Sequence, residues 1–87
     1  MKFLGAKIRE QNVTFGIMAV KPYILHDPVA RENMQDFGVR VFGYVPIVLV
    51  AKNARGIPTY WGRQDIVRFL AKVPPQCIPW KKYTIAA

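Results

Sequence analysis

The chain has 87 residues, with thirteen Lys and Arg against five Asp and Glu, and its formal net charge is +8. This length predicts one domain, residues 1–87, and a hydrophobic content of 52% argues against intrinsic disorder. The longest apolar run, residues 45–51, is far shorter than the roughly 20 residues of a membrane-spanning helix, and the first residues do not resemble a signal peptide. We therefore expect no membrane partner.

The positive charge is concentrated in the second half of the chain. Residues 1–44 carry a net charge of +2, whereas residues 45–87 carry +6 because Asp65 is their only acidic residue. Such a field attracts anions and favours nucleic acid or another polyanion as a partner. Many small basic domains use a similar charge only to stay dissolved, so this alternative remains open.

Two strands are predicted at the start of the chain. Residues 3–10 partly alternate apolar and polar side chains, and residues 13–21 are rich in β-branched and aromatic types. Gln11 and Asn12 indicate a turn between them. We expect the second strand to be buried on both faces.

A helix is predicted after Asp27. The Asp27 carboxylate can accept hydrogen bonds from the free N–H groups of a first turn, and Pro28 suits the first helical position. Gly38 follows an apolar face of helical spacing. We therefore expect a helix over residues 28–37, ending at Gly38 with a positive φ.

The next segment predicts a buried strand and a hairpin. Residues 39–53 are read as extended, and residues 45–51 are continuously apolar, which is typical of a strand covered on both faces. Residues 53–56 carry turn-forming types and residues 57–61 form a second short strand. Pro58 indicates that this strand lies at an edge or begins late.

A second helix is predicted over residues 62–73. Asp65 falls in its first turn and Lys72 in its last, and both charges suit the helix dipole. Pro74 then ends the helix. The tail, residues 81–85, is read either as an edge strand or as a segment that crosses the sheet.

The predicted order is β-β-α-β-β-α, with a last strand as an option. This order indicates an α+β fold, or a small α/β fold, with a mixed sheet of about four strands packed with two helices. The strands before and after the first helix should be parallel neighbours joined by a right-handed crossover, whereas hairpins add antiparallel strands. Whether the two helices share one face of the sheet is left open.

The stretch FGVRVFGYVPIVLVAKNARG resembles the closing half of a thioredoxin-like domain. There a Val-Pro or Ile-Pro pair opens a strand, a hairpin turns at a glycine, and a helix covers the sheet. The resemblance covers about 40 of the 87 residues. The redox Cys-X-X-Cys motif is absent, so the resemblance implies no oxidoreductase activity.

The side chains that most enzymes use are nearly absent. The chain has no serine, His26 is its only histidine and Cys77 its only cysteine, and no spacing joins these two. We expect His26 in a loop and Cys77 as an inert packing residue. Glu32 and Asp36 lie one turn apart on the predicted solvent face and do not form a catalytic pair. We therefore expect no catalytic residue, metal site or cofactor, and a reducing, cytoplasmic location.

Basic and aromatic residues of the second half form the candidate site. The predicted set is Lys52, Arg55, Tyr60, Trp61, Arg63, Lys81 and Lys82. Lys and Arg neutralise phosphates and aromatic rings stack on bases, while Arg63 would stand where free helical N–H groups favour anions. We expect a non-enzymatic module that docks an anionic partner, nucleic acid first of all.

The alternative is a protein-interaction or homo-oligomeric module without a role in nucleic-acid binding. In that case the partner is another protein or a second copy of this chain. Because tryptophan is large and apolar, Trp61 and Trp80 are both expected to be mostly buried in a protein of this size. Exposed aromatics on one basic face would favour the first hypothesis, and scattered charges around buried tryptophans the second.

Overall fold

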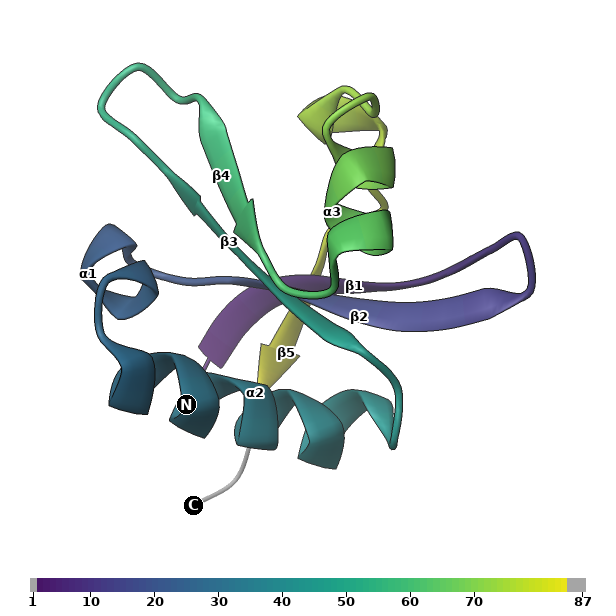
Figure 1. Cartoon of the computed structure of the whole chain (residues 1–87), viewed down its shortest axis with the longest axis horizontal. Helices are drawn as coiled ribbons and strands as arrows, with labels where there is room; N and C mark the ends of the chain where they lie inside the picture. The colour runs from purple at the N-terminus through teal and green to yellow at the C-terminus, as the bar shows by residue number, and fades with distance from the viewer. Residues whose placement is uncertain (1, 85–87) are drawn as a thin grey trace.

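A five-stranded mixed sheet forms the centre of the computed structural model, which describes residues 2–84 (Figure 1). The strands are β1 (Lys2–Glu10), β2 (Val13–Ala19), β3 (Ile47–Lys52), β4 (Pro58–Trp61) and β5 (Lys81–Thr84). The helices are α1 (Pro22–Leu25), α2 (Pro28–Phe42) and α3 (Gln64–Leu70), with a 3-10 turn, η1 (Pro75–Cys77). The predicted fold class is confirmed. None of the helices within residues 2–84 combines the length and apolar character that crossing a membrane requires.

The strands lie in the order β4-β3-β2-β1-β5. β2 and β3 form the predicted parallel pair, in which Gly16 lies opposite Ile47, and all other neighbours are antiparallel. The continuous apolar runs of β2 and β3 place them at the centre, and every residue of β3 except Lys52 is buried. A parallel pair needs a long crossover, which α1 and α2 supply.

Helices cover both faces of this sheet, which answers the question left open by the sequence (Figure 1). Side chains alternate along a strand, so Ile47 and Leu49 face α1 and α2, whereas Val48 and Val50 face α3. On the α3 face the core is completed by Leu70 and its neighbours. The sheet is thus the middle of three layers.

The helix α2 is longer than predicted. It ends at Phe42 and is capped by Gly43, which has a φ of 92°, and the prediction that Gly38 ends it was wrong. Gly38 is instead buried inside the helix, where an added Cβ would approach Cγ2 of Ile47 to 2.7 Å. Its role is to let α2 lie close to β3. Phe42, predicted as extended, is a buried residue of the last helical turn.

The start of α2 agrees with the sequence prediction. The Asp27 carboxylate accepts hydrogen bonds from the N–H groups of Val29 and Ala30, at 3.0 and 3.3 Å. The short helix α1 was missed. It begins at Pro22, and β2 therefore ends at Ala19 rather than at residue 21.

The hairpin between β3 and β4 also agrees. Gly56 takes a φ of 77°, and Pro58 is the first residue of β4. The Asn53 side chain stabilises the turn because its oxygen accepts hydrogen bonds from the N–H groups of Arg55 and Ile57, at 2.9 and 3.0 Å. The hairpin therefore has a defined shape.

The helix α3 is shorter than predicted, and Lys72 lies beyond its end at Leu70. Arg68 is the basic residue of its last turn. Between α3 and Pro74 the chain forms a turn of 3-10 type, because the N–H of Val73 donates to the Leu70 carbonyl, three residues earlier, at 3.0 Å. The tail forms the edge strand β5 beside β1. Residue 85, which the prediction included, lies outside the described residues.

Candidate functional site

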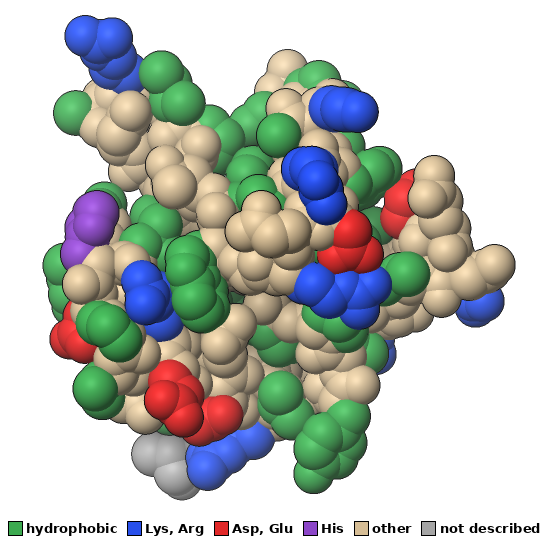
Figure 2. All heavy atoms as spheres, in the orientation of Figure 1, with side chains coloured by type: hydrophobic (Ala, Val, Ile, Leu, Met, Phe, Trp, Pro, Cys, Tyr) green, Lys and Arg blue, Asp and Glu red, His purple; other side chains and the backbone are tan. Residues whose placement is uncertain are grey.

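A groove of about 240 Å³ lies between α1 and the β3–β4 hairpin, at the carboxyl ends of the parallel strands β2 and β3. Ligands of open α/β sheets commonly bind at such ends, because the connections diverge there. The lining residues of this hairpin groove are Pro22, Leu25, His26, Ala51, Lys52, Asn53, Thr59 and Trp61. In the space-filling view the hairpin stands away from the body of the protein, with a cationic side chain at its tip (Figure 2).

Trp61 is the exposed aromatic of the hairpin groove. Most of its surface is covered, as expected, but 36% stays exposed, which places it at the surface rather than in the core. The guanidinium carbon of Arg31, on α2, lies 4.5 Å from the centre of the Trp61 ring. Arg31 is itself held by a hydrogen bond from Nη1 to the Leu25 carbonyl at 2.9 Å. The ring therefore has a fixed cationic neighbour.

Further cationic side chains surround the groove. Lys52 lines it and is exposed, and Arg55 lies in the exposed turn of the hairpin. His26 and Arg31 were not in the predicted set. His26 lies at the end of α1, exposed as expected for a loop residue, and it lines the groove. The predicted parallel crossover was the signal that could have found both, since it carries the residues after β2 toward the end of β3.

Tyr60 lies on the opposite face of the sheet from Trp61. Successive residues of a strand point to opposite sides, and Tyr60 packs against the core cluster that contains Ile66 and Leu70. Its hydroxyl is buried and has no hydrogen-bond partner among residues 2–84. Burial raises the pKa of Tyr60. Its ring is therefore separate from the groove.

Arg63 forms an ion pair with Asp65. The Nε and Nη2 groups of Arg63 donate to the two carboxylate oxygens, each at 2.7 Å, and both side chains are about half exposed. The hydrogen bond from Arg63 lowers the pKa of Asp65 to about 2, and the same bond raises the pKa of Arg63. The charge of Arg63 is thus directed at a carboxylate of its own chain.

Lys81 and Lys82 lie on β5, at the opposite edge of the sheet from β4. The ammonium of Lys81 lies 5.6 Å from the centre of the Tyr83 ring. Trp80, just before this strand, is partly buried as expected, and its indole N–H donates to the Pro75 carbonyl at 3.0 Å. The predicted set is therefore divided between two edges. Of its members, Lys52 and Trp61 line the hairpin groove, whereas Arg55 lies in the turn at the tip of the hairpin.

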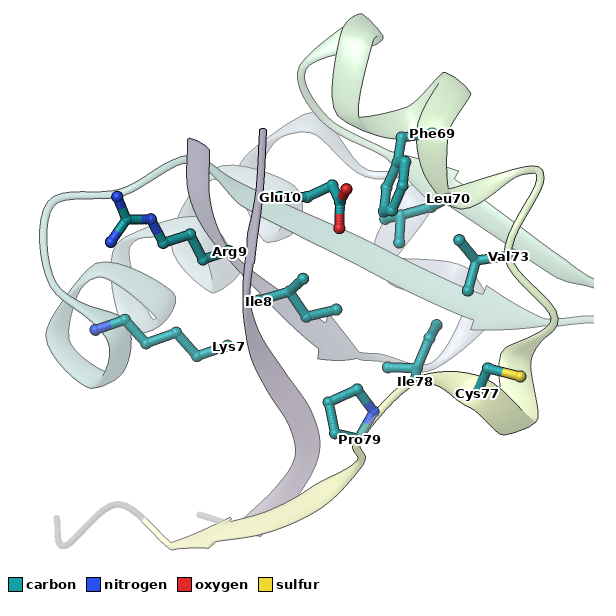
Figure 3. Close-up of a pocket in the computed structure, with 10 residues that line it drawn as sticks. All are labelled: Lys7, Ile8, Arg9, Glu10, Phe69, Leu70, Val73, Cys77, Ile78 and Pro79. Carbon is teal, nitrogen blue, oxygen red and sulfur yellow. The ribbon is translucent and has the colours of Figure 1, made fainter. Parts of the chain in front are cut away.

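A second cleft, of about 370 Å³, lies between β1 and the segment formed by α3 and η1 (Figure 3). We term it the β1 cleft. Cys77 lines it and is exposed, rather than packed in the core as expected. Within the described part of the chain no three His, Cys, Asp or Glu side chains are grouped so that they could hold a metal ion.

No family model, no curated protein and no solved structure matches this chain. What the site can do therefore follows from its own side chains. The hairpin groove combines an exposed indole, the exposed cation of Lys52 and a histidine, at the carboxyl ends of the parallel strands β2 and β3, and Arg55 lies in the turn beyond it. This combination is suited to binding an aromatic and anionic ligand.

Proposed function

We propose that this protein is a non-enzymatic module that binds single-stranded nucleic acid in the hairpin groove. One observation carries the proposal: the exposed ring of Trp61 lies in the same groove as Lys52, with Arg31 over the ring. A single strand offers both phosphates and unstacked bases. An exposed aromatic side chain can stack on such a base, whereas the bases of a duplex are already stacked on one another.

The contact between Arg31 and Trp61 supports this function by ordering the ring before a ligand arrives. A side chain that is already held loses less conformational freedom on binding, so more of the stacking energy appears as affinity. The net charge of +8 adds a long-range attraction for the phosphate backbone. Lys52 and Arg55 then make the local contacts with phosphates.

We also propose a cytoplasmic location. A lone, exposed cysteine suits the reducing cytoplasm, where cytosolic nucleic acids are also found.

Protein recognition is the second candidate function, and it is supported by a different surface, the unpaired backbone edge of β1.

Fluorescence anisotropy with a labelled single strand of about twelve nucleotides tests the proposed function. RNA, DNA and a matching duplex are titrated at roughly 50 and 200 mM salt, since phosphate contacts make affinity salt-dependent. We expect single strands to bind more tightly than the duplex. Trp61→Ala should weaken single-strand binding by roughly ten- to a hundredfold, the loss of one stacked base.

The charge contribution is measured with two double variants. Lys52→Ala/Arg55→Ala removes two cations from the hairpin, and Lys81→Ala/Lys82→Ala removes the same charge from the opposite edge of the sheet. The hairpin variant should reduce the slope of log affinity against log salt by about 1.4, or 0.7 per phosphate contact of a single strand. Equal losses in both variants, or no binding at low salt, would refute the groove as the contact surface.

A further inference from the structure

Part of β1 has an open backbone edge, and a proline is the cause. β5 pairs with β1 only as far as Gly5, which lies opposite Lys81. The same register would bring Trp80 opposite Ala6 and then Pro79 opposite Lys7. Proline has no N–H to donate to the ladder, and the chain turns away here, with the Trp80 N–H bonded to the Ile78 carbonyl at 2.8 Å. Residues 6–10 of β1 therefore have β2 on one side only.

Hydrogen bonds along a strand alternate between its two neighbours, and this alternation identifies which backbone N–H and C=O groups of β1 face the open edge. β2 bonds to β3 through its even-numbered residues, since the Gly16 N–H donates to the Pro46 carbonyl at 2.9 Å. Its odd-numbered residues therefore bond to β1, where their partners carry even numbers. Lys7 and Arg9 are odd-numbered and direct their N–H and C=O groups to the open edge. Such unpaired groups are a template for an added strand.

The side chains around this edge have two distinct characters. Ile8 points into the β1 cleft, toward Phe69 and Val73 on the far wall, whereas Lys7 and Arg9 point to the opposite side of the strand (Figure 3). Both cations are exposed, and within residues 2–84 neither lies within salt-bridge distance of a carboxylate. An added strand would therefore meet positive charge on one face and, on the other, a largely apolar cleft that Glu10 also lines (Figure 3).

A second copy of the chain does not suit this edge. Antiparallel pairing of two copies about Ile8 would bring Lys7 of each copy opposite Arg9 of the other. Like charges directly opposite one another destabilise a strand pair, and lysine is a common protection of edges against self-pairing. The occupant must instead carry negative charge opposite these two residues.

We propose that the open edge of β1 binds an extended acidic segment of a partner protein by strand addition. The backbone of the segment pairs with Lys7 and Arg9, and its Asp or Glu side chains face these two cations. An apolar side chain between the acidic ones enters the β1 cleft beside Ile8. This recognition uses another surface than the hairpin groove and goes beyond the binding of nucleic acid.

The probe is a capped peptide of about eight residues that alternates Asp or Glu with Val or Ile, a length typical of a strand. The amide hydrogen exchange of Lys7 and Arg9 is followed by NMR, because strand addition protects these two N–H groups directly. We expect their exchange to slow on saturation with the peptide. A peptide with Lys in place of each acidic residue is the control and should bind roughly tenfold more weakly or worse.

A charge reversal tests the pairing from the protein side. Lys7→Glu/Arg9→Glu changes two exposed side chains, and it should bind the acidic peptide roughly tenfold more weakly while gaining affinity for the Lys peptide. Lys81→Glu/Lys82→Glu on β5 makes the same charge change and should keep the original preference. The proposal is overturned if exchange at Lys7 and Arg9 does not slow, or if both reversals behave alike. Protection that rises with protein concentration alone would assign the edge to a second copy and would also overturn it.

Discussion

The guanidinium of Arg31 lies over the ring of Trp61, 4.5 Å from its centre, and this contact joins α2 to the edge strand β4. The same guanidinium donates to the Leu25 carbonyl at 2.9 Å, so one side chain links α1, α2 and β4. Two of these elements, α1 and β4, border the hairpin groove. The shape of the groove therefore depends on a contact between residues far apart in the sequence.

A double-mutant cycle measures this contact. Arg31→Ala and Trp61→Ala are expected to show a coupling of about 0.5–1 kcal/mol in the free energy of unfolding, the usual size of a partly exposed cation–π pair. Urea titrations of both single variants and the double variant give the value. Arg40→Ala is the control, because Arg40 lies over Phe37 instead and should be additive with Trp61→Ala. Additivity of Arg31→Ala with Trp61→Ala would contradict the contact.

The close approach of α2 to the sheet predicts the effect of Gly38→Ala. Alanine is a better helix former by about 1 kcal/mol, but its Cβ would lie 2.7 Å from Cγ2 of Ile47 and 3.0 Å from Sδ of Met18. Overpacking should dominate and lower the free energy of unfolding by about 1–3 kcal/mol. Thermal unfolding checks this, with Asn33→Ala on the exposed side of the same helix as the control. A rise in stability for Gly38→Ala would contradict the packing argument.

Gly38 also shows where sequence reasoning fails. Local rules predicted β2, β3, the hairpin and the Asp27 cap, because apolar runs, turn residues and capping side chains act within a few residues. The sequence prediction ended α2 at Gly38, whereas Gly43 is the residue that caps it. The choice between them depends on a contact with Ile47, which belongs to another element and cannot be inferred from local sequence.

The candidate site shows the same limit. Charge and aromatic content pointed to Lys52, Arg55 and Trp61, but the predicted set also included residues that the sheet order places at the opposite edge. Lys81 and Lys82 are separated from the hairpin because β5 pairs with β1 and not with β4. A single sequence does not specify the order of the strands in a sheet. His26 and Arg31 were missed because only the crossover between β2 and β3 brings them to the groove.

The turn between β1 and β2 predicts a stabilising change. Gln11 and Asn12 both have positive φ values, 49° and 66°, in a two-residue hairpin. Left-handed backbone is unfavourable for residues with a Cβ, and Asn-Gly is the preferred pair in such turns. Gln11→Asn/Asn12→Gly should therefore raise the free energy of unfolding by about 1 kcal/mol. Urea denaturation measures this change in the free energy of unfolding. Gly56→Ala, at a φ of 77° in the other hairpin, should instead lower the free energy of unfolding.

The ion pair of Arg63 and Asp65 predicts a pH dependence. The folded protein holds the pKa of Asp65 at about 2, below its ordinary value of 3.8. The pair therefore stabilises the fold above about pH 4, and this contribution is lost as the pH falls from about 4 to 2. An NMR titration of the carboxylate gives the pKa directly. In Arg63→Gln it should rise toward 3.8, whereas Arg68→Gln should leave it low; an unchanged value in Arg63→Gln would contradict the assignment.

An NMR titration with an unlabelled single-stranded oligonucleotide at low salt tests the binding of nucleic acid in the hairpin groove most directly. The indole N–H resonances of Trp61 and Trp80 report on the two aromatics separately. We predict a progressive shift of the Trp61 indole and of the Lys52 and Arg55 amides, while the Trp80 indole, bonded to the Pro75 carbonyl, stays in place. A stationary Trp61 signal, or shifts centred on Lys81 and Lys82, would contradict the account.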